Sequence, residues 1–320
     1  MNFLVKKGRR RKTKRTSSRA AAPSGMVAGF YRRLLDSWGA QNWWPAESRF
    51  EVVAGAILTQ NTSWKNVEQA MTNLRAAGAL SLEGICRIDI GELETLLRPA
   101  GYFRQKSRRL KDLAAYIVTS YGQGQAESAL DHMLAEPTAK LREELLRQKG
   151  VGLETADSIL LYAGDHPVFV VDAYTRRIFE RHKLVPADAG YEEIRLLVEG
   201  ELRAPEQDHC PTSAPDDRRR HGPPAGSPQV SAEKHGAGPG APRHVRPGTH
   251  AISAVSGGTR SELAQRYNEF HALLVQVGKH YCLKSEPKCE ECPLREFLEE
   301  ELTIRRSRKA GERKNGPPAR

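Results

Sequence analysis

Apolar residues recur at helical spacing along most of the chain. From Val27 onward, Phe30, Leu34, Leu35 and Trp38 fall on one face of a helix. The same pattern returns over residues 50–58, 67–74, 93–97, 110–117, 141–146, 159–162 and 263–277. Short connections carrying Gly, Pro or Ser separate these segments. Only residues 168–171 (Val-Phe-Val-Val) are typical of a strand, and one isolated strand makes no sheet, so the pattern predicts an all-α fold.

Three segments depart from this pattern. Residues 203–260 are rich in Pro, Gly, Ser, His and Arg and carry almost no large apolar side chains. Ordering them would bury too little surface to offset the lost conformational entropy, so we predict disorder. Because helical spacing resumes at Leu263, this stretch is an insertion within one domain. We also predict disordered basic tails at residues 1–25 and 299–320.

Composition narrows the class of protein. With 320 residues and 39% apolar composition, the chain can bury one large core or two modest ones. No apolar run has the length of a membrane span or the character of a signal peptide. The five cysteines are an odd number and three are clustered, which argues against a disulfide framework and for a reducing compartment. We expect an intracellular, cytoplasmic protein in which Cys86 is a small buried hydrophobe.

The location of the positive charge matters more than its total. The net charge is +11, but residues 1–25 carry +9, residues 203–260 carry +3 and residues 305–320 carry +6. Subtracting these three segments leaves −7 for the remainder, so the overall charge is not evidence that the folded part binds DNA. Basic tails raise salt-sensitive, non-specific affinity, although most are simply solvated. Within the folded part, the basic run at residues 104–111, which includes Lys106, is the better phosphate-binding candidate.

A Gly-Val-Gly turn lies between two amphipathic segments at residues 148–156 (Gln-Lys-Gly-Val-Gly-Leu-Glu-Thr-Ala). Gly150 and Gly152 permit a tight turn and let backbone N–H groups approach a phosphate, and the following helix points the positive end of its dipole at the same anion. This is the pattern of a helix-hairpin-helix. Alone, it is equally compatible with a hairpin that binds no ligand.

An aspartate follows this hairpin sixteen residues after Ala156. Asp172 precedes a predicted helix start at Ala173, where an N-cap is a common role for Asp. A carboxylate at that position is stabilised in its charged form. Cleavage of an N-glycosidic bond builds positive charge on the sugar, which such a carboxylate would stabilise. The capping role and the catalytic role are compatible.

The hairpin and its downstream Asp172 resemble the signature of the helix-hairpin-helix DNA glycosylases, the endonuclease III superfamily. The resemblance covers roughly residues 26–202 and 261–298 and includes residues 58–62 (Leu-Thr-Gln-Asn-Thr) and three late cysteines. It implies a six-helix domain at residues 50–166. It also implies a second helical domain built from residues 26–49, 167–202 and 261–298, with DNA between the two. Asp172 would be catalytic, and Gly150, Val151, Gly152 and Thr155 would contact the DNA backbone.

Two further features refine the expected activity. Bifunctional members of the family carry a lysine where this chain has Glu154, so the resemblance implies a monofunctional enzyme in which Asp172 orients a water. Trp43 and Trp44, together with Glu154, resemble the 3-methyladenine glycosylase branch. Alkylated purines are cationic and Trp is the best aromatic partner for a cation, although paired Trp residues also commonly pack in cores.

Other parts of the substrate pocket are weaker candidates. Phe50 is a candidate wall residue, as is Tyr174. Gln60 matches the position where the family inserts a side chain into the gap left by the flipped nucleotide, and its amide suits a bond to the orphaned base. A Gln that merely follows a buried helix is an equally ordinary explanation.

The late cysteines form the pattern Cys282-x6-Cys289-x2-Cys292, which resembles the iron–sulfur loop of endonuclease III. The fourth cysteine of that pattern is Leu298 here. Three possibilities remain open: a 4Fe–4S cluster with another fourth ligand, a zinc site that uses His280, or a loop that holds nothing. We favour a structural cluster that orders Lys284 and Lys288 beside the DNA; Cys210 is an improbable substitute ligand.

The leading hypothesis is a monofunctional, monomeric, nucleoid-associated glycosylase that removes alkylated bases from double-stranded DNA in base excision repair. One alternative is a bifunctional endonuclease III-type glycosylase and abasic-site lyase that acts on oxidised pyrimidines, which Glu154 disfavours. A second is a non-catalytic DNA-binding protein that uses the hairpin alone and needs neither Asp172 nor an aromatic slot.

Overall fold

The computed structural model describes residues 25–122, 126–203, 253–255, 257–258 and 260–298. These residues contain helices and no strand, which confirms the all-α prediction. None of the described helices is both long and apolar enough to cross a bilayer. The disorder predicted for residues 1–25 and 299–320, and for most of 203–260, concerns segments that lie almost wholly outside the described residues.

The described elements follow one another as α1 (Met26–Trp38), α2 (Arg49–Leu58), α3 (Trp64–Ala76), α4 (Leu82–Arg87), α5 (Ile90–Leu96), η1 (Arg98–Ala100), α6 (Phe103–Tyr121), α7 (Ala126–Leu134), α8 (Thr138–Arg147), α9 (Leu153–Ser158), η2 (Ile159–Ala163), α10 (Ala173–Arg181), α11 (Tyr191–Arg203), α12 (Glu262–His280) and η3 (Cys289–Glu291). The segment η2 is one turn of π-helix that continues α9.

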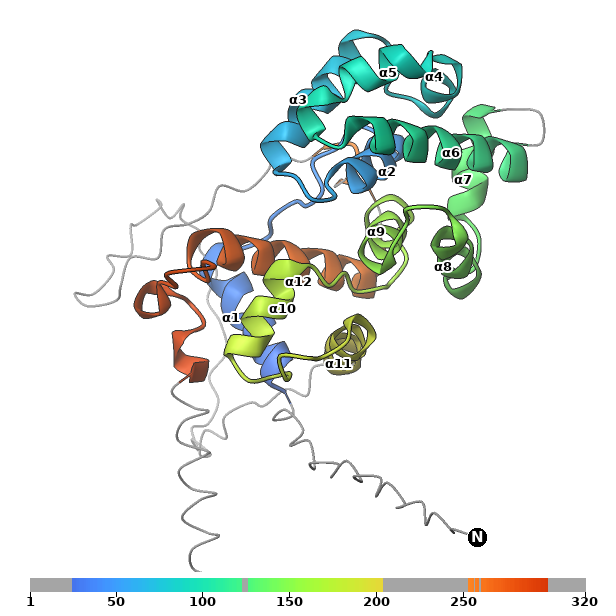
Figure 1. The fold of residues 1–320 in the computed structure, drawn as a ribbon. Coiled ribbons are helices and arrows are strands. Elements are labelled where there is room, and N and C mark those ends of the chain that lie inside the picture. Colours follow the sequence, from blue (N-terminus) through green and yellow to red (C-terminus); the bar gives the residue numbers. More distant parts are fainter. Residues whose placement is uncertain (1–24, 123–125, 204–252, 256, 259, 299–320) are drawn as a thin grey trace, which may run out of the picture.

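The helices gather into two lobes. The first lobe contains α2–α9, and the second contains α1 and α10–α12 (Figure 1). Helix α2 is central to the first lobe, since every residue from Phe50 to Leu58 is buried. Its start is fixed by Ser48, whose hydroxyl accepts a hydrogen bond from the Glu51 N–H at 3.2 Å, as expected of an N-cap.

The second lobe joins segments that are far apart in the sequence. Helix α1 packs against α11 and α12, and α10 lies along α12 (Figure 1). The Glu201 carboxylate on α11 accepts a hydrogen bond from the Val27 N–H at 2.9 Å. Val27 lies in the first turn of α1, where a backbone N–H has no acceptor within its own helix. Tyr267, Phe270 and Leu274 on α12 are fully buried in the core of this lobe.

Residues 168–171, the strand-like run, form a buried extended segment that returns the chain to the second lobe. Side chains, rather than a neighbouring strand, satisfy its backbone. The Phe169 N–H donates to the Glu199 carboxylate at 3.0 Å, and the Val171 N–H donates to the Tyr191 hydroxyl at 3.3 Å. These partners explain why an apolar β-branched run remains stable without a sheet.

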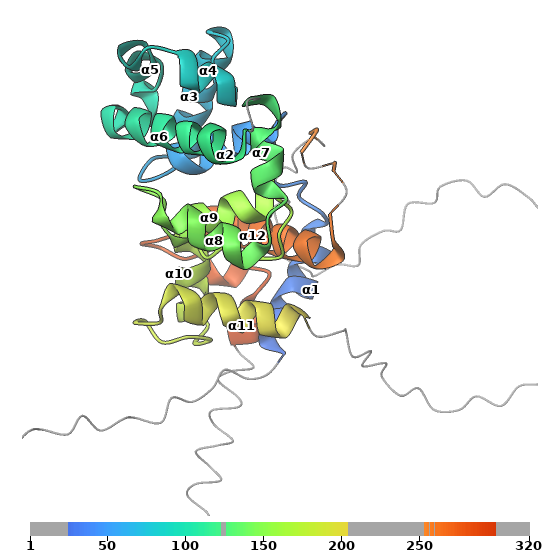
Figure 2. The ribbon, with the colours of Figure 1, turned by 90° about the vertical axis from the view of Figure 1, so that its right-hand side faces the viewer.

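The η2 turn, which continues α9, contacts α12 where the lobes meet, and α8 packs against α9 (Figure 2). Arg142 on α8 pairs with the fully buried Asp157 on α9 at 2.6 Å and with Glu192 on α11 at 2.6 Å. A second link joins η2 to α12, where the Tyr162 hydroxyl and the His271 Nδ1 are 2.6 Å apart in the buried interior. Polar bonds therefore fix the position of the hairpin relative to the second lobe.

Candidate active site between the two lobes

A cavity of about 310 Å³ lies at the junction of the lobes. Its size falls within the range of small-molecule sites. The first lobe contributes residues near the ends of α2, α3 and α9, and the second contributes residues of α10 and α12. The lining consists of Trp43, Trp44, Thr59, Thr62, Ser63, Trp64, Glu154, Ser158, Tyr162, Val170, Asp172, Tyr174, His271, Val275 and Lys279.

Helix α12 holds the Trp43–Trp44 pair in this lining. The Trp43 carbonyl accepts hydrogen bonds from the Asn268 amide and from Arg260 Nη1, the latter at 3.4 Å. Arg260 is itself paired with Asp165 at 2.6 Å, so this end of the predicted insertion is ordered. Trp44 packs over Gly55 of α2, where an added Cβ would lie 3.1 Å from the indole. The pair is 6% exposed at each residue, and it both packs in the core and lines the cavity.

Two aromatic residues that the sequence did not single out complete the wall. The Trp44 ring centroid is 5.0 Å from that of Trp64, edge to face, and 5.1 Å from that of Tyr162. Trp64 lies two residues after the matched segment 58–62, and this proximity is the one local signal that could have pointed to it. Tyr162 lies in an apolar helical pattern that core residues share. Tyr174, a predicted wall residue, also lines the cavity.

Asp172 faces this cavity from the start of α10. Its Oδ1 accepts a hydrogen bond from the Thr175 N–H at 2.8 Å, so it is the N-cap. Its Oδ2 is 3.7 Å from His271 Nε2, and the side chain is 14% exposed. Burial lowers the pKa of His271 and the charge of Asp172 opposes this shift, which favours a neutral imidazole beside the carboxylate. His271 was not predicted as a site residue, because nothing near it in the chain marks it.

Glu154 and Lys279 add charge to the cavity mouth. Glu154 lies in the first turn of α9 and is solvent-exposed on one side, while nearby protein atoms and the negative Asp172 raise its pKa to about 7. The Lys279 ammonium is 5.8 Å from the Trp43 ring centroid. Burial lowers the pKa of Lys279, and Glu68 and Asp172 oppose that shift. Lys279 was also missed, since it lies on a helix more than a hundred residues from Asp172.

The hairpin turn leads directly into α9, with Gly150 partly exposed and Gly152 exposed. Gly150 has φ +86°, a conformation that favours glycine, and an added Cβ would lie 2.2 Å from Arg109 Nε. Gly152 is exposed and caps α9 with open space around it. Val151 is 7% exposed and donates its N–H to the Gln148 carbonyl at 3.1 Å. The Val151 N–H is thus already engaged, and contact of Gly150, Val151 or Gly152 with a phosphate stays a prediction.

Gln60 does not line the cavity, and its predicted insertion into the gap left by a flipped nucleotide stays a prediction. Its amide nitrogen donates to the Gly150 carbonyl at 3.0 Å and to the Thr155 hydroxyl at 2.9 Å, and its oxygen accepts from Arg109 Nη1 at 2.7 Å. In this arrangement Gln60 braces the hairpin from within the first lobe. Thr155, a predicted DNA contact, is only 6% exposed and its hydroxyl is engaged by Gln60.

Two predicted contacts are wrong. Lys106 is 2% exposed, and its ammonium donates to the carbonyls of Leu58 at 2.8 Å and Ala100 at 2.7 Å. Burial lowers the pKa of Lys106 to about 8, and this side chain cannot reach a phosphate. Phe50 is 5% exposed in the core of the first lobe and does not line the cavity.

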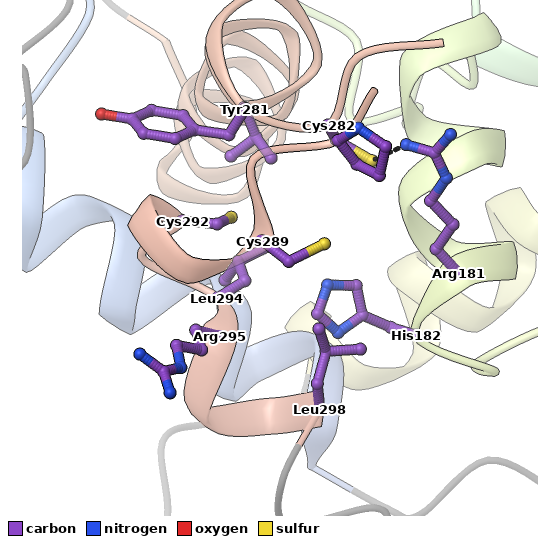
Figure 3. Close-up of a pocket in the computed structure, with 11 residues that line it drawn as sticks. Arg181, His182, Tyr281, Cys282, Cys289, Cys292, Leu294, Arg295 and Leu298 are labelled. Carbon is purple, nitrogen blue, oxygen red and sulfur yellow. Dashed lines mark hydrogen bonds between the residues drawn. The ribbon is translucent and has the colours of Figure 1, made fainter. Parts of the chain in front are cut away.

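The cysteine loop borders a second cavity of about 310 Å³, which also lies against α10 (Figure 3). Cys282, Cys289 and Cys292 all line it. The Cys282 Sγ accepts a hydrogen bond from Arg181 Nη1 at 3.2 Å, and burial raises the pKa of Cys292 to about 12. Within the described residues, no three His, Cys, Asp or Glu side chains are placed to hold a single metal ion.

Three other expectations about this region and the cysteines can be compared with the structure. His280, proposed for a zinc site, is exposed at the end of α12 and does not line the second cavity. His182 does line it, and sequence analysis missed this residue. Cys210 lies outside the described residues. Cys86 is exposed, so its predicted burial is wrong; on the short helix α4, the preceding Ile85 takes the buried position.

Comparisons with known proteins agree with this geometry. The model of the HhH-GPD superfamily base excision DNA repair proteins matches residues 54–203. A Methanocaldococcus jannaschii protein assigned as a DNA repair glycosylase is 38% identical over 85% of this chain and 95% of its own length. The structure of 3-methyladenine DNA glycosylase MagIII from H. pylori, bound to 1,N6-ethenoadenine, has a TM-score of 0.53 at 25% identity, covering 79% of this chain and 95% of that one. A trapped endonuclease III–DNA covalent intermediate has a TM-score of 0.54 at 15% identity, covering 86% of this chain and 95% of that one, which shows the shared fold.

Proposed function

Because the chain belongs to the HhH-GPD superfamily of base excision DNA repair proteins, we propose that it is a monofunctional DNA glycosylase that hydrolyses the N-glycosidic bond of alkylated purines. The observation that carries this proposal is the position of Asp172 in the lining of a cavity walled by three tryptophans. An aromatic slot selects a base, and the adjacent carboxylate acts on its sugar.

Recognition begins with a base that leaves the DNA stack and enters the cavity. Trp43, Trp44 and Trp64 offer faces and edges to a purine ring, and stacking on such rings stabilises a flipped base. An alkylated purine is cationic, and two carboxyl groups, those of Asp172 and Glu154, border the same space. A neutral undamaged base would gain the stacking without the attraction to Asp172 and to the ionised fraction of Glu154, whose pKa is about 7.

Hydrolysis then requires a carboxylate and a water. As the bond between C1′ and the base nitrogen lengthens, positive charge grows on the sugar and Asp172 Oδ2 faces it. Asp172 orients a water whose oxygen bonds to C1′, and the carboxylate takes up the proton that the water loses. The electron pair of the broken bond stays on the base, which leaves as a neutral purine when it was cationic. Oδ1 stays bonded to the Thr175 N–H throughout, which keeps the reactive oxygen in place.

One observation favours a second candidate function, base removal coupled to strand cleavage. Glu154 cannot form a Schiff base, but Lys279 lines the cavity with a lowered pKa that increases its neutral, nucleophilic fraction. Attack of its amine on C1′ would displace the base together with the bonding electron pair. Loss of the amine protons and opening of the C1′–O4′ bond, with O4′ taking a proton, would give a protein-bound imine. Loss of a proton from C2′ would then eliminate the 3′ phosphate.

The test uses duplexes with a single alkylated purine, thymine glycol or abasic site, scored for strand breaks with and without hot alkali. We expect breaks only with the alkylated purine and only after alkali, and none with Asp172→Asn. Breaks without alkali, together with a borohydride-trapped adduct that Lys279→Ala abolishes, would replace the monofunctional proposal with the second candidate.

We also propose that the cysteine loop holds a 4Fe–4S cluster, as the resemblance implies. Three thiols and the buried His182 line the same cavity, and thiolates are the ligands that such clusters use. When bound, the cluster would cross-link the loop between α12 and η3. It would take no part in base release. The loop carries Lys284 and Lys288, which would then be held in fixed positions.

A further inference from the structure

The cysteine loop provides three ligands where the corresponding iron–sulfur loop provides four. Cys282, Cys289 and Cys292 line the cavity shown in Figure 3, and so does Leu298, which stands at the fourth position of the pattern. A leucine side chain has no donor atom. A fourth ligand therefore has to come from another element that reaches this cavity.

His182, at the end of α10, reaches the cavity from the opposite wall. It is 6% exposed, and its Nδ1 is buried without a hydrogen-bond partner within the described residues. Leaving such a group unsatisfied costs about 1–3 kcal/mol, so native proteins usually provide a partner. The ring also packs edge to face on Phe30, with centroids 4.8 Å apart, which limits its rotation.

The position of the imidazole suits the missing ligand. In Figure 3 it lies between Cys289 and Leu298, and the Cys289 side chain points towards the side of the cavity where His182 and Cys282 lie. Arg181, the neighbouring residue, donates to both the Cys282 Sγ at 3.2 Å and the Leu283 carbonyl. The end of α10 is thus already bonded to the cysteine loop through one residue and faces it through the next.

We propose that His182 is the fourth ligand of a 4Fe–4S cluster whose other ligands are Cys282, Cys289 and Cys292. This inference rests on the proposed cluster. The four donors surround a cavity of about 310 Å³, and no three of the described candidate ligands converge on a point that suits a single ion. A cavity of this volume leaves room for a polynuclear cluster among these donors. Histidine in place of a thiolate leaves the cluster less negative and raises its reduction potential.

The experiment compares the full chain with His182→Ala, His182→Cys and the matched control His280→Ala, each reconstituted with iron and sulfide without oxygen. Iron, sulfide and zinc contents, absorbance near 400 nm, reduction potential and pulsed EPR of the reduced protein are measured. We expect parental iron content and a strongly coupled nitrogen nucleus in the parent and in His280→Ala. His182→Ala should lose iron, whereas His182→Cys should keep it, lose the nitrogen coupling and show a lower potential.

The rescue by His182→Cys separates ligation from a general failure to fold. A parent protein that takes up no iron, or that holds zinc instead, would overturn the proposal. So would iron content and nitrogen coupling that are unchanged in His182→Ala. None of these measurements uses DNA, so they stand apart from the outcome of the base-release assay, which tests the proposed glycosylase function.

Discussion

Asp172→Asn separates the charge of the proposed catalytic residue from its structural role. Asn is as good an N-cap as Asp, so the amide oxygen can still accept the bond from the Thr175 N–H that is 2.8 Å long in the parent. The variant should therefore fold with an unfolding free energy within about 0.5 kcal/mol of the parent. What it loses is the negative charge at Oδ2.

The position of that charge sets the size of the effect. The Asp172 side chain is 14% exposed, so its field is screened less than in bulk water, and an effective dielectric constant near 20 is appropriate. A unit positive charge that develops about 4 Å away is then stabilised by about 4 kcal/mol. At about 1.4 kcal/mol per factor of ten, Asp172→Asn should slow base release roughly a thousandfold. DNA affinity should change little, since an anionic carboxylate does not attract the phosphate backbone that supplies most of that affinity.

The assay is single-turnover base release from a duplex with one alkylated purine, alongside a fluorescence-anisotropy titration of the same duplex. Asp89→Asn is the matched control, because Asp89 caps α5 through the Gly91 N–H at 2.7 Å, is exposed, and does not line the cavity. It should retain the parental rate. A folded Asp172→Asn variant within tenfold of the parental rate, or an equal loss in Asp89→Asn, would refute the electrostatic role.

Three further predictions concern the hairpin, a buried lysine and pH. Gly150→Ala should lower the unfolding free energy by about 1–2 kcal/mol, because φ is +86° and the new Cβ meets Arg109. The control Gly152→Ala, where the added Cβ lies in open space, should shift the unfolding free energy by less than about 0.5 kcal/mol. Equal urea midpoints for the two variants would contradict this. Lys106→Met removes the donor to two buried carbonyls and should destabilise the fold by about 1–3 kcal/mol per carbonyl. The salt dependence of DNA binding should stay unchanged. A weaker dependence of DNA affinity on salt concentration would instead indicate that Lys106 contacts a phosphate. The folded-state pKa of Glu154 is raised from 4.5 to about 7, so the folded protein binds this proton more tightly and loses stability as pH rises through that window. Glu154→Gln should therefore gain melting temperature over the parent at pH 8 but not at pH 4, and the same gap at both pH values would count against the shift.

The local parts of the fold and the site could be read from the sequence. Helical spacing gave the all-α class, and the hairpin with Asp172 identified a carboxylate that does face the cavity. Lys106 shows where such reading stops. It occupies the same helical register as the buried Leu110 and Leu113, so the spacing indicated an inward position. A lysine at this position can be buried only because its ammonium donates hydrogen bonds to two carbonyls. Those contacts form in the folded protein, and no local sequence pattern predicts them.

The parts of the site that were not predicted come from residues that are far apart in the chain. Trp64, His271 and Lys279 reach the cavity from separate helices, and their positions depend on how the lobes dock. Gln60 matched a family position, but its amide bonds to the hairpin, and such bonds depend on where another loop lies. A one-dimensional pattern marks which residues can do chemistry, whereas packing decides which of them face the same space.

The buried bond between Tyr162 and His271 has a consequence for how a lesion is reached. It joins η2 to α12 beside the cavity, so a hinge motion that separates the two lobes would break a buried hydrogen bond. Breaking this bond would add about 0.5–1.5 kcal/mol to any opening of the lobes, so we expect much of the deformation on binding to fall on the duplex. Smooth bending of a short duplex costs on the order of 1–6 kcal/mol, so lesions next to a nick or a flexible pyrimidine–purine step should be extracted fastest.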